Sequence, residues 1–146
     1  MNKSWIANGF TAANALFGGL SIMMSISGEY HVAAICILFA MAADAFDGRV
    51  ARALGTAGPM GVELDSLSDD ISFGVAAGAL MYSYQLRELG ALGFIPCALL
   101  GAFCAFRLAR FNVKVTSVHG YFEGLPCPTV GVIIACYVLS GVKIWN

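Results

Sequence analysis

The chain alternates long apolar runs with short polar connectors, and the runs have the length of membrane-crossing helices. A helix that spans a bilayer needs about 20 predominantly apolar residues. The connectors between the runs carry Gly, Ser and charged residues, which favour turns at the membrane surface. The pattern predicts an all-α integral membrane protein, a polytopic bundle with five visible spans: Gly9–Ile26, Val32–Arg52, Gly61–Tyr84, Gly90–Phe111 and Pro126–Val142.

Composition supports a membrane protein and excludes several other classes. Of the 146 residues, 59% are hydrophobic and 12% are charged, whereas a soluble domain has about twice that charged share. The net charge is −1 and no basic stripe is present, so nucleic acid is not an expected partner. We predict one transmembrane domain over residues 1–146, with membrane lipids around it.

Basic residues predict the orientation of the spans. If the spans alternate in direction, six basic residues fall on one side, and only Arg87 and Lys143 fall on the other. The positive-inside rule then places the amino terminus on the cytoplasmic side of the cell membrane. The six residues on that side are Lys3, Arg49, Arg52, Arg107, Arg110 and Lys114.

The second and third apolar runs carry carboxylates at their facing ends. Asp44 and Asp47 are three residues apart, and Asp65 and Asp69 are four apart, so each pair shares one helix face. Gly61 lies one turn earlier on the face of the second pair. The second helix runs inward and the third outward, which brings both pairs to the same cytoplasmic depth.

Four carboxylates at one place require neutralising cations. Each Asp in a spanning helix costs about 2.5–3.5 kcal/mol on insertion scales, and neighbouring carboxylates also repel one another. Hard oxygen ligands favour Mg²⁺ or Mn²⁺, with Ca²⁺ as a further occupant, and a pair of such ions suits displacement at phosphorus. Two other interpretations are possible. The carboxylates could be acidic helix ends at the membrane interface, or they could line the path of a cation transporter. A transporter would spread its carboxylates through the membrane depth.

The spacing of these residues resembles the signature of the CDP-alcohol phosphatidyltransferase family. The motif is Asp44-x2-Asp47-Gly48-x2-Ala51-Arg52-x8-Gly61-x3-Asp65-x3-Asp69. The resemblance implies an enzyme in which an alcohol attacks the lipid-side phosphorus of a CDP-linked lipid and releases CMP. It also implies two divalent cations, with Asp44 and Asp65 bridging both ions, and Asp47 and Asp69 each completing one site. Asp69 is the implied proton acceptor, whereas Asp70 points away on the helix.

The same resemblance implies a set of contacts to the CDP-lipid. Small residues let a base or sugar approach the helix backbone, and an Arg can pair with a phosphate. The family usually has Ser or Thr six residues after the Arg, but this chain has Gly58 there, and Thr56 is the nearest hydroxyl. The implied CDP-lipid contacts are Asn8, Thr11, Gly48, Ala51, Arg52 and Gly61.

Further stretches resemble the phosphatidylserine synthase branch of the family. They are Asn8-x2-Thr11-x2-Asn14-x3-Gly18, Ser72–Ala76, Arg107–Asn112 and Gly124-Leu125-Pro126-x-Pro128. The branch implies L-serine as the acceptor, with CDP-diacylglycerol or an ether-lipid equivalent as donor. Glycerol 3-phosphate or an inositol compound is the alternative acceptor. The implied contacts to the acceptor or lipid phosphate are Asn14, Arg107, Arg110, Asn112, Gly124 and Pro126.

Each of these polar residues also has a structural interpretation. Asn8, Thr11 and Asn14 could bridge helices by hydrogen bonds, and Pro126 could simply start the fifth helix. Arg107 and Arg110 could be ordinary positive-inside residues. The resemblance further implies a six-helix fold and a homodimer, so we expect a sixth helix to be either missing after the fifth run or dispensable.

Overall fold

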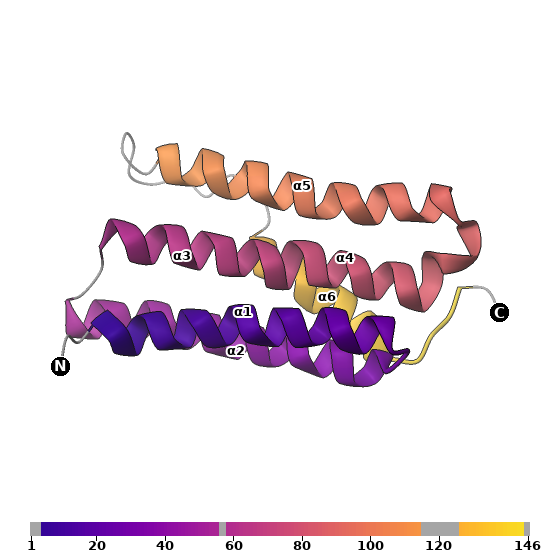
Figure 1. The fold of residues 1–146 in the computed structure, drawn as a ribbon, viewed down its shortest axis with the longest axis horizontal. Helices are drawn as coiled ribbons and strands as arrows, with labels where there is room; N and C mark the ends of the chain where they lie inside the picture. Colours follow the sequence, from indigo (N-terminus) through magenta and orange to yellow (C-terminus); the bar gives the residue numbers. More distant parts are fainter. Residues whose placement is uncertain (1–3, 56–57, 115–125, 145–146) are drawn as a thin grey trace.

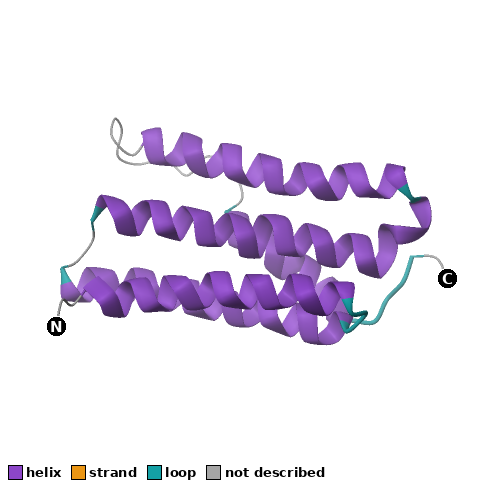
Figure 2. Ribbon diagram, in the orientation of Figure 1, coloured by secondary structure: helices purple, strands orange, loops and turns teal. Residues whose placement is uncertain are grey.

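The computed structural model describes residues 4–55, 58–114 and 126–144, and these residues form helices joined by short turns (Figure 2). All five predicted apolar runs are helical, which confirms the all-α class. The principal helices are α1 (Ser4–Ile26), α2 (Tyr30–Leu54), α3 (Pro59–Asp69), α4 (Ala76–Met81), α5 (Ala91–Lys114) and α6 (Cys127–Leu139).

The third predicted run becomes a central rod. Two π-helical stretches, η1 (Asp70–Val75) and η2 (Tyr82–Leu86), continue α3 and α4 with right-handed helical angles at each junction. At 1.5 Å per residue the rod from α3 to η2 is about 40 Å long. A short 3₁₀ turn, η3 (Arg87–Leu89), and Gly90 with φ of 56° then reverse the chain into α5.

The other helices surround this rod (Figure 1). α1 and α2 form a hairpin along one side of it, and Gly28 supplies the positive φ of 84° that their turn requires. α5 runs along the opposite side, and α6 crosses behind the rod and packs against α2, η1 and α4. The rod therefore contacts helices on several sides, which makes it the structural centre of the molecule.

Small residues allow these helices to pack closely. Lipid is as apolar as a leucine side chain, so helix association in a membrane depends on close packing and on hydrogen bonds between helices. A Cβ atom added at Gly131 of α6 would lie 2.8 Å from Cδ1 of Phe73, and one added at Gly78 would lie 2.5 Å from the Cys97 carbonyl oxygen. Fully buried small residues include Ala33, Ala34, Ala40, Ala76 and Ala77.

Three helices of the described chain are long and apolar enough to cross a membrane. They are Asn8–Ile26, Tyr30–Val50 and Ala91–Val113. The fifth predicted span was too long, because its helix ends at Leu139, shortly before Gly141 with φ of 70°, and so has only 13 residues. Large apolar side chains on the outer faces, such as Leu16, Phe39 and Phe106, are 56–76% exposed. The chain is an integral membrane protein.

Candidate active site

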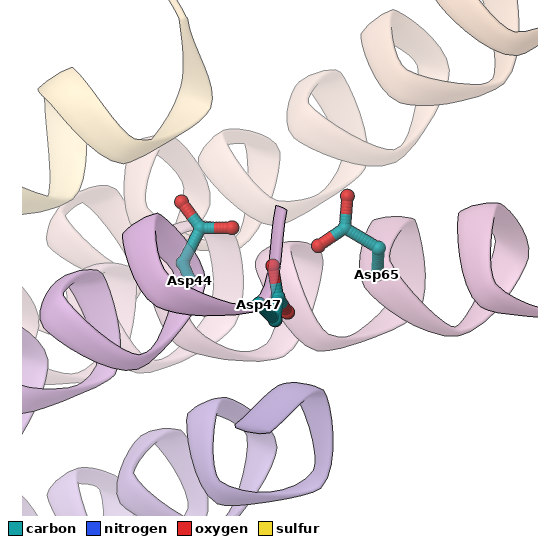
Figure 3. A group of neighbouring side chains, drawn as sticks. All are labelled: Asp44, Asp47 and Asp65. Atoms are coloured by element: carbon teal, nitrogen blue, oxygen red, sulfur yellow. The ribbon is translucent and has the colours of Figure 1, made fainter. Parts of the chain in front are cut away.

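Three carboxylates from two helices meet beside the rod. Asp44 and Asp47 extend from the last turns of α2, and Asp65 extends from α3. One carboxylate oxygen of each lies within 4.8 Å of the others, and Asp44 and Asp65 face one another with Asp47 between them (Figure 3). We call these three residues the Asp trio. The predicted convergence of the two acidic faces is confirmed for these three residues.

The Asp trio has the properties of a cation site. Asp47 is only 6% exposed, and Asp44 and Asp65 are half-buried. Asp47 Oδ2 and Asp65 Oδ1 are both buried and have no hydrogen-bond partner among the described residues. A buried carboxylate oxygen without a donor is costly, and a cation satisfies several such oxygens at once. Three hard oxygen donors in this arrangement fit a divalent metal ion.

Asp69 lies one helical turn beyond Asp65 and adjoins the Asp trio. Asp44 is within hydrogen-bonding reach of both Asp65 and Asp69. Asp69 is 7% exposed, and its Oδ1 accepts a hydrogen bond of 3.0 Å from Nδ2 of Asn14 on α1. Asp69, the fourth predicted carboxylate, therefore lies at the edge of the Asp trio and is hydrogen-bonded to α1.

Asp70 faces a different neighbour, as the helical spacing predicts. A Cβ atom added at Gly74 would lie 2.7 Å from Asp70 Oδ1 and 3.0 Å from Cβ of Cys104 on α5. Asp69 instead contacts Asn14 on α1. These two neighbouring carboxylates thus face different helices, and Asp69 is the one that adjoins the Asp trio.

The predicted CDP-lipid contacts that the structure describes lie on the helices around the Asp trio. Thr11 is buried and its hydroxyl is within hydrogen-bonding reach of Asp47, as is the Gly48 backbone amide. A Cβ atom added at Gly61 would lie 3.9 Å from Asn8 Oδ1, so the Asn8 side chain of α1 reaches the Gly61 position on α3. The side chains of Ala51 and Arg52 lie outside the described part of the structure, and so does Thr56.

The predicted acceptor contacts separate into different places. Asn14 lies at Asp69, whereas Asn112 donates from Nδ2 to Ser66 Oγ at 2.9 Å and thereby joins α5 to α3. Arg107 donates to Cys127 Sγ at 3.6 Å, and both residues line a cavity of about 130 Å³ together with Phe73.

The remaining predicted acceptor contacts are less central. Arg110 is exposed on α5. Pro126 is the N-cap of α6, as its structural interpretation predicts. Gly124 lies outside the described residues.

Two serines take part in this framework that sequence reasoning did not assign to the site. Ser72 Oγ donates to the Asn14 carbonyl at 2.9 Å, and Ser66 accepts from Asn112. Ser72 follows Asp69 by three residues, so helical spacing places both on one face. That spacing was a usable signal, because it puts the Ser72 hydroxyl on the face that Asp69 presents to α1.

The family of the chain follows from comparison with known proteins. The CDP-alcohol phosphatidyltransferase family matches residues 4–145, which include the whole Asp trio, Asp69 and the helices that carry them. The chain belongs to the CDP-alcohol phosphatidyltransferase family. No solved structure matches the chain.

Several curated relatives share much of the sequence. A CDP-diacylglycerol–serine O-phosphatidyltransferase from Helicobacter pylori is 38% identical over 90% of this chain and 56% of its own length. An archaetidylserine synthase from Methanothermobacter thermautotrophicus is 40% identical over 88% of this chain and 55% of its length. A CDP-diacylglycerol–serine O-phosphatidyltransferase from Bacillus subtilis is 37% identical over 85% of this chain and 70% of its own length. The chain thus spans little more than half the length of the first two.

Proposed function

We propose that this protein transfers the phosphatidyl group of CDP-diacylglycerol, or of an ether-lipid equivalent, to L-serine. The products are phosphatidylserine and CMP. The Asp trio carries this proposal, because it places three cation-binding carboxylates at a family-specific spacing on two packed helices. The names of the relatives from three different organisms support serine as the acceptor.

In this proposal Asp44, Asp47, Asp65 and Asp69 hold two divalent cations, Mg²⁺ or Mn²⁺. When bound, such ions neutralise the carboxylates and polarise the phosphate oxygens of the CDP-lipid. Thr11 and Gly48 fix the orientation of Asp47, and Asn8, Gly61, Ala51 and Arg52 receive the nucleotide and its phosphates. A Cβ atom added at Gly61 would lie 3.9 Å from Asn8 Oδ1, which supports a shared role for these two residues of α1 and α3.

Asp69 accepts the proton of the serine hydroxyl. The serine oxygen forms a bond to the lipid-side phosphorus, and the bond from that phosphorus to the CMP oxygen breaks. Because Asp69 is nearly buried, water competes poorly for its carboxylate. Its neighbour Asp70 faces α5 and takes no part in this step.

The basic residues support a site on the cytoplasmic side of the cell membrane. Arg49 follows Asp47 by two residues near the end of α2, and Arg107 and Arg110 are near the end of α5. Figure 1 shows that these ends of α2 and α5 lie at the same end of the bundle. By the positive-inside rule this end faces the cytoplasm. Family membership supports a homodimer, which cross-linking in native membranes would detect.

CMP release tests the proposal directly. Purified protein in detergent should release CMP from CDP-diacylglycerol with Mn²⁺ or Mg²⁺ when L-serine is added, and phosphatidylserine should appear in equal amount. Asp69→Asn should abolish turnover while keeping measurable binding of the CDP-lipid. Asp70→Asn is the matched control, because it changes the adjacent carboxylate, which faces α5 instead of the Asp trio.

Different outcomes reject different parts of the proposal. Release with glycerol 3-phosphate or an inositol compound, but none with serine, would reject serine as the acceptor. An absence of release with every acceptor would reject the transferase activity. Wild-type turnover by Asp69→Asn would remove this residue from the proton-acceptor role.

A further inference from the structure

A single buried side chain of α1 holds the predicted proton acceptor. Asn14 is 0% exposed, and its Nδ2 donates to Asp69 Oδ1 at 3.0 Å, joining residues 55 positions apart. Its own Oδ1 is buried without a hydrogen-bond partner among the described residues. Leaving a buried amide oxygen unsatisfied costs about 1–3 kcal/mol. An apolar residue would avoid that cost, so the hydrogen bond that the amide donates to Asp69 explains why position 14 is an Asn.

The backbone of Asn14 is held as firmly as its side chain. Ser72 Oγ donates to the Asn14 carbonyl at 2.9 Å, and Ser72 is fully buried. Asp69 and Ser72 are three residues apart on one face of the rod, so α1 is attached at two successive points. Gly18, one turn further along α1, lets the helices approach, because an added Cβ there would lie 2.9 Å from Ser72 Cα. The amide of Asn14 therefore has little freedom to move.

The hydrogen bond that the neutral Asn14 amide donates to one carboxylate oxygen of Asp69 determines the role of the other oxygen. With Oδ1 of Asp69 engaged by Asn14, Oδ2 is the atom left for a cation and for the alcohol proton. A cationic side chain at this position would compete with a metal ion for the carboxylate, and a hydrocarbon would let the carboxylate rotate. Asn combines a fixed donor with no charge.

From this geometry we infer that Asn14 is a positioning residue, which orients Asp69 toward the Asp trio and the acceptor hydroxyl without touching substrate. The inference rests on the proposed function. It revises the expectation from the sequence that Asn14 contacts the acceptor. A positioning residue should change the turnover number and cation binding, whereas a substrate contact should chiefly change the KM for serine.

Two measurements on Asn14→Ala test this inference. Free Mn²⁺ counted by electron paramagnetic resonance, with no substrate present, should give a Mn²⁺ Kd about fivefold above wild type. In the CMP-release assay, kcat should fall at least about tenfold, while the KM values for serine and CDP-diacylglycerol stay within about twofold. Fivefold and tenfold changes correspond to about 1 and 1.4 kcal/mol, which is the net contribution of one typical hydrogen bond.

A double-mutant comparison shows whether Asn14 acts through Asp69. In an Asp69→Ala background, adding Asn14→Ala should leave the Mn²⁺ Kd unchanged, because the group that Asn14 orients is absent. Ser21→Ala is the matched control. Ser21 is also fully buried on α1 and donates to the Ala33 carbonyl at 2.9 Å, away from the carboxylates. This control should change neither the Mn²⁺ Kd nor kcat.

Three results would overturn the inference. They are a rise in the KM for serine with kcat unchanged, equal effects of Asn14→Ala and Ser21→Ala, and a full Mn²⁺ effect of Asn14→Ala in the Asp69→Ala background. Asn14→Ser, whose hydroxyl is too short to reach Asp69, decides the question if the Ala variant is not recovered as a monodisperse protein. Mn²⁺ binding does not require turnover, so failure here is distinct from failure of the proposed activity in the wild type.

Discussion

Gly18 on α1 packs directly against Ser72 on the central rod. A Cβ atom at Gly18 would meet Ser72 Oγ and would lie 2.9 Å from Ser72 Cα. Ser72 Oγ also donates to the carbonyl of Asn14, whose side chain reaches Asp69. The absence of a side chain at Gly18 thus sets the separation of α1 from the helix that carries two of the carboxylates.

Gly18→Ala should force α1 and the rod apart. Overpacking at a tight contact costs about 1–3 kcal/mol, so we expect a lower thermal unfolding midpoint in detergent and reduced CMP release. The matched control is Gly19→Ala, because nothing lies within 4 Å of a Cβ atom at Gly19. Equal unfolding midpoints for the two variants would show that the contact is not tight in the folded protein.

Asp65→Asn should weaken cation binding much more than Glu63→Gln. Both changes remove one negative charge from α3, but Asp65 belongs to the Asp trio and Glu63 is exposed. We expect the Mn²⁺ Kd of Asp65→Asn to rise at least about tenfold, because one hard oxygen ligand becomes a neutral amide. Titration of Mn²⁺ by electron paramagnetic resonance measures it. Similar Kd values for both variants would argue against a site at the Asp trio.

Removal of divalent metal should reversibly stop activity and lower stability. Excess chelator should abolish CMP release, and added Mg²⁺ or Mn²⁺ should restore it. A ligand that binds only the folded state at about 100 times its Kd stabilises that state by about 2.7 kcal/mol. The thermal unfolding midpoint should therefore rise with Mn²⁺ in the wild type but hardly in the Asp44→Asn variant. A metal-independent midpoint in the wild type would contradict this prediction.

The bond between Asn112 and Ser66 should stabilise the contact of α5 with α3. Asn112→Ala and Ser66→Ala should each lower the free energy of unfolding, and the double variant should lose less than the sum, with a coupling of about 0.5–1.5 kcal/mol. Ser68 supplies the control pair, since its hydroxyl donates to Leu64 within its own helix at 2.8 Å. Asn112→Ala and Ser68→Ala should be additive. If the effects of Asn112→Ala and Ser66→Ala are also additive, the hydrogen bond between these residues does not stabilise the protein.

Much of the helical layout could be predicted from the chain alone. The apolar runs and their breaks at Gly28, Pro59 and Gly90 predict where helices begin and end, since helix length and capping depend on nearby residues. The acidic pairs are also local features. Spacings of three and four residues place Asp44 with Asp47, and Asp65 with Asp69, on shared faces whatever the fold.

The partners of the other polar residues could not be predicted in this way. Arg107 meets Cys127, Asn112 meets Ser66, and Asn14 meets Asp69. Each partner depends on the rotation and sliding of one helix against another. Those quantities are set where small residues such as Gly18 and Gly131 let the backbones approach, which involves contacts between distant parts of the chain.

The sequence by itself determined the membrane class, the helical segments and the carboxylates that form the Asp trio, because periodicity and motif spacing are properties of single helices. Only the tertiary structure decided that Asp69 is held from α1 and that Asp70 is turned toward α5. The two residues are adjacent and chemically identical. Their surroundings differ because close packing presents α1 to one side of the rod and α5 to the other.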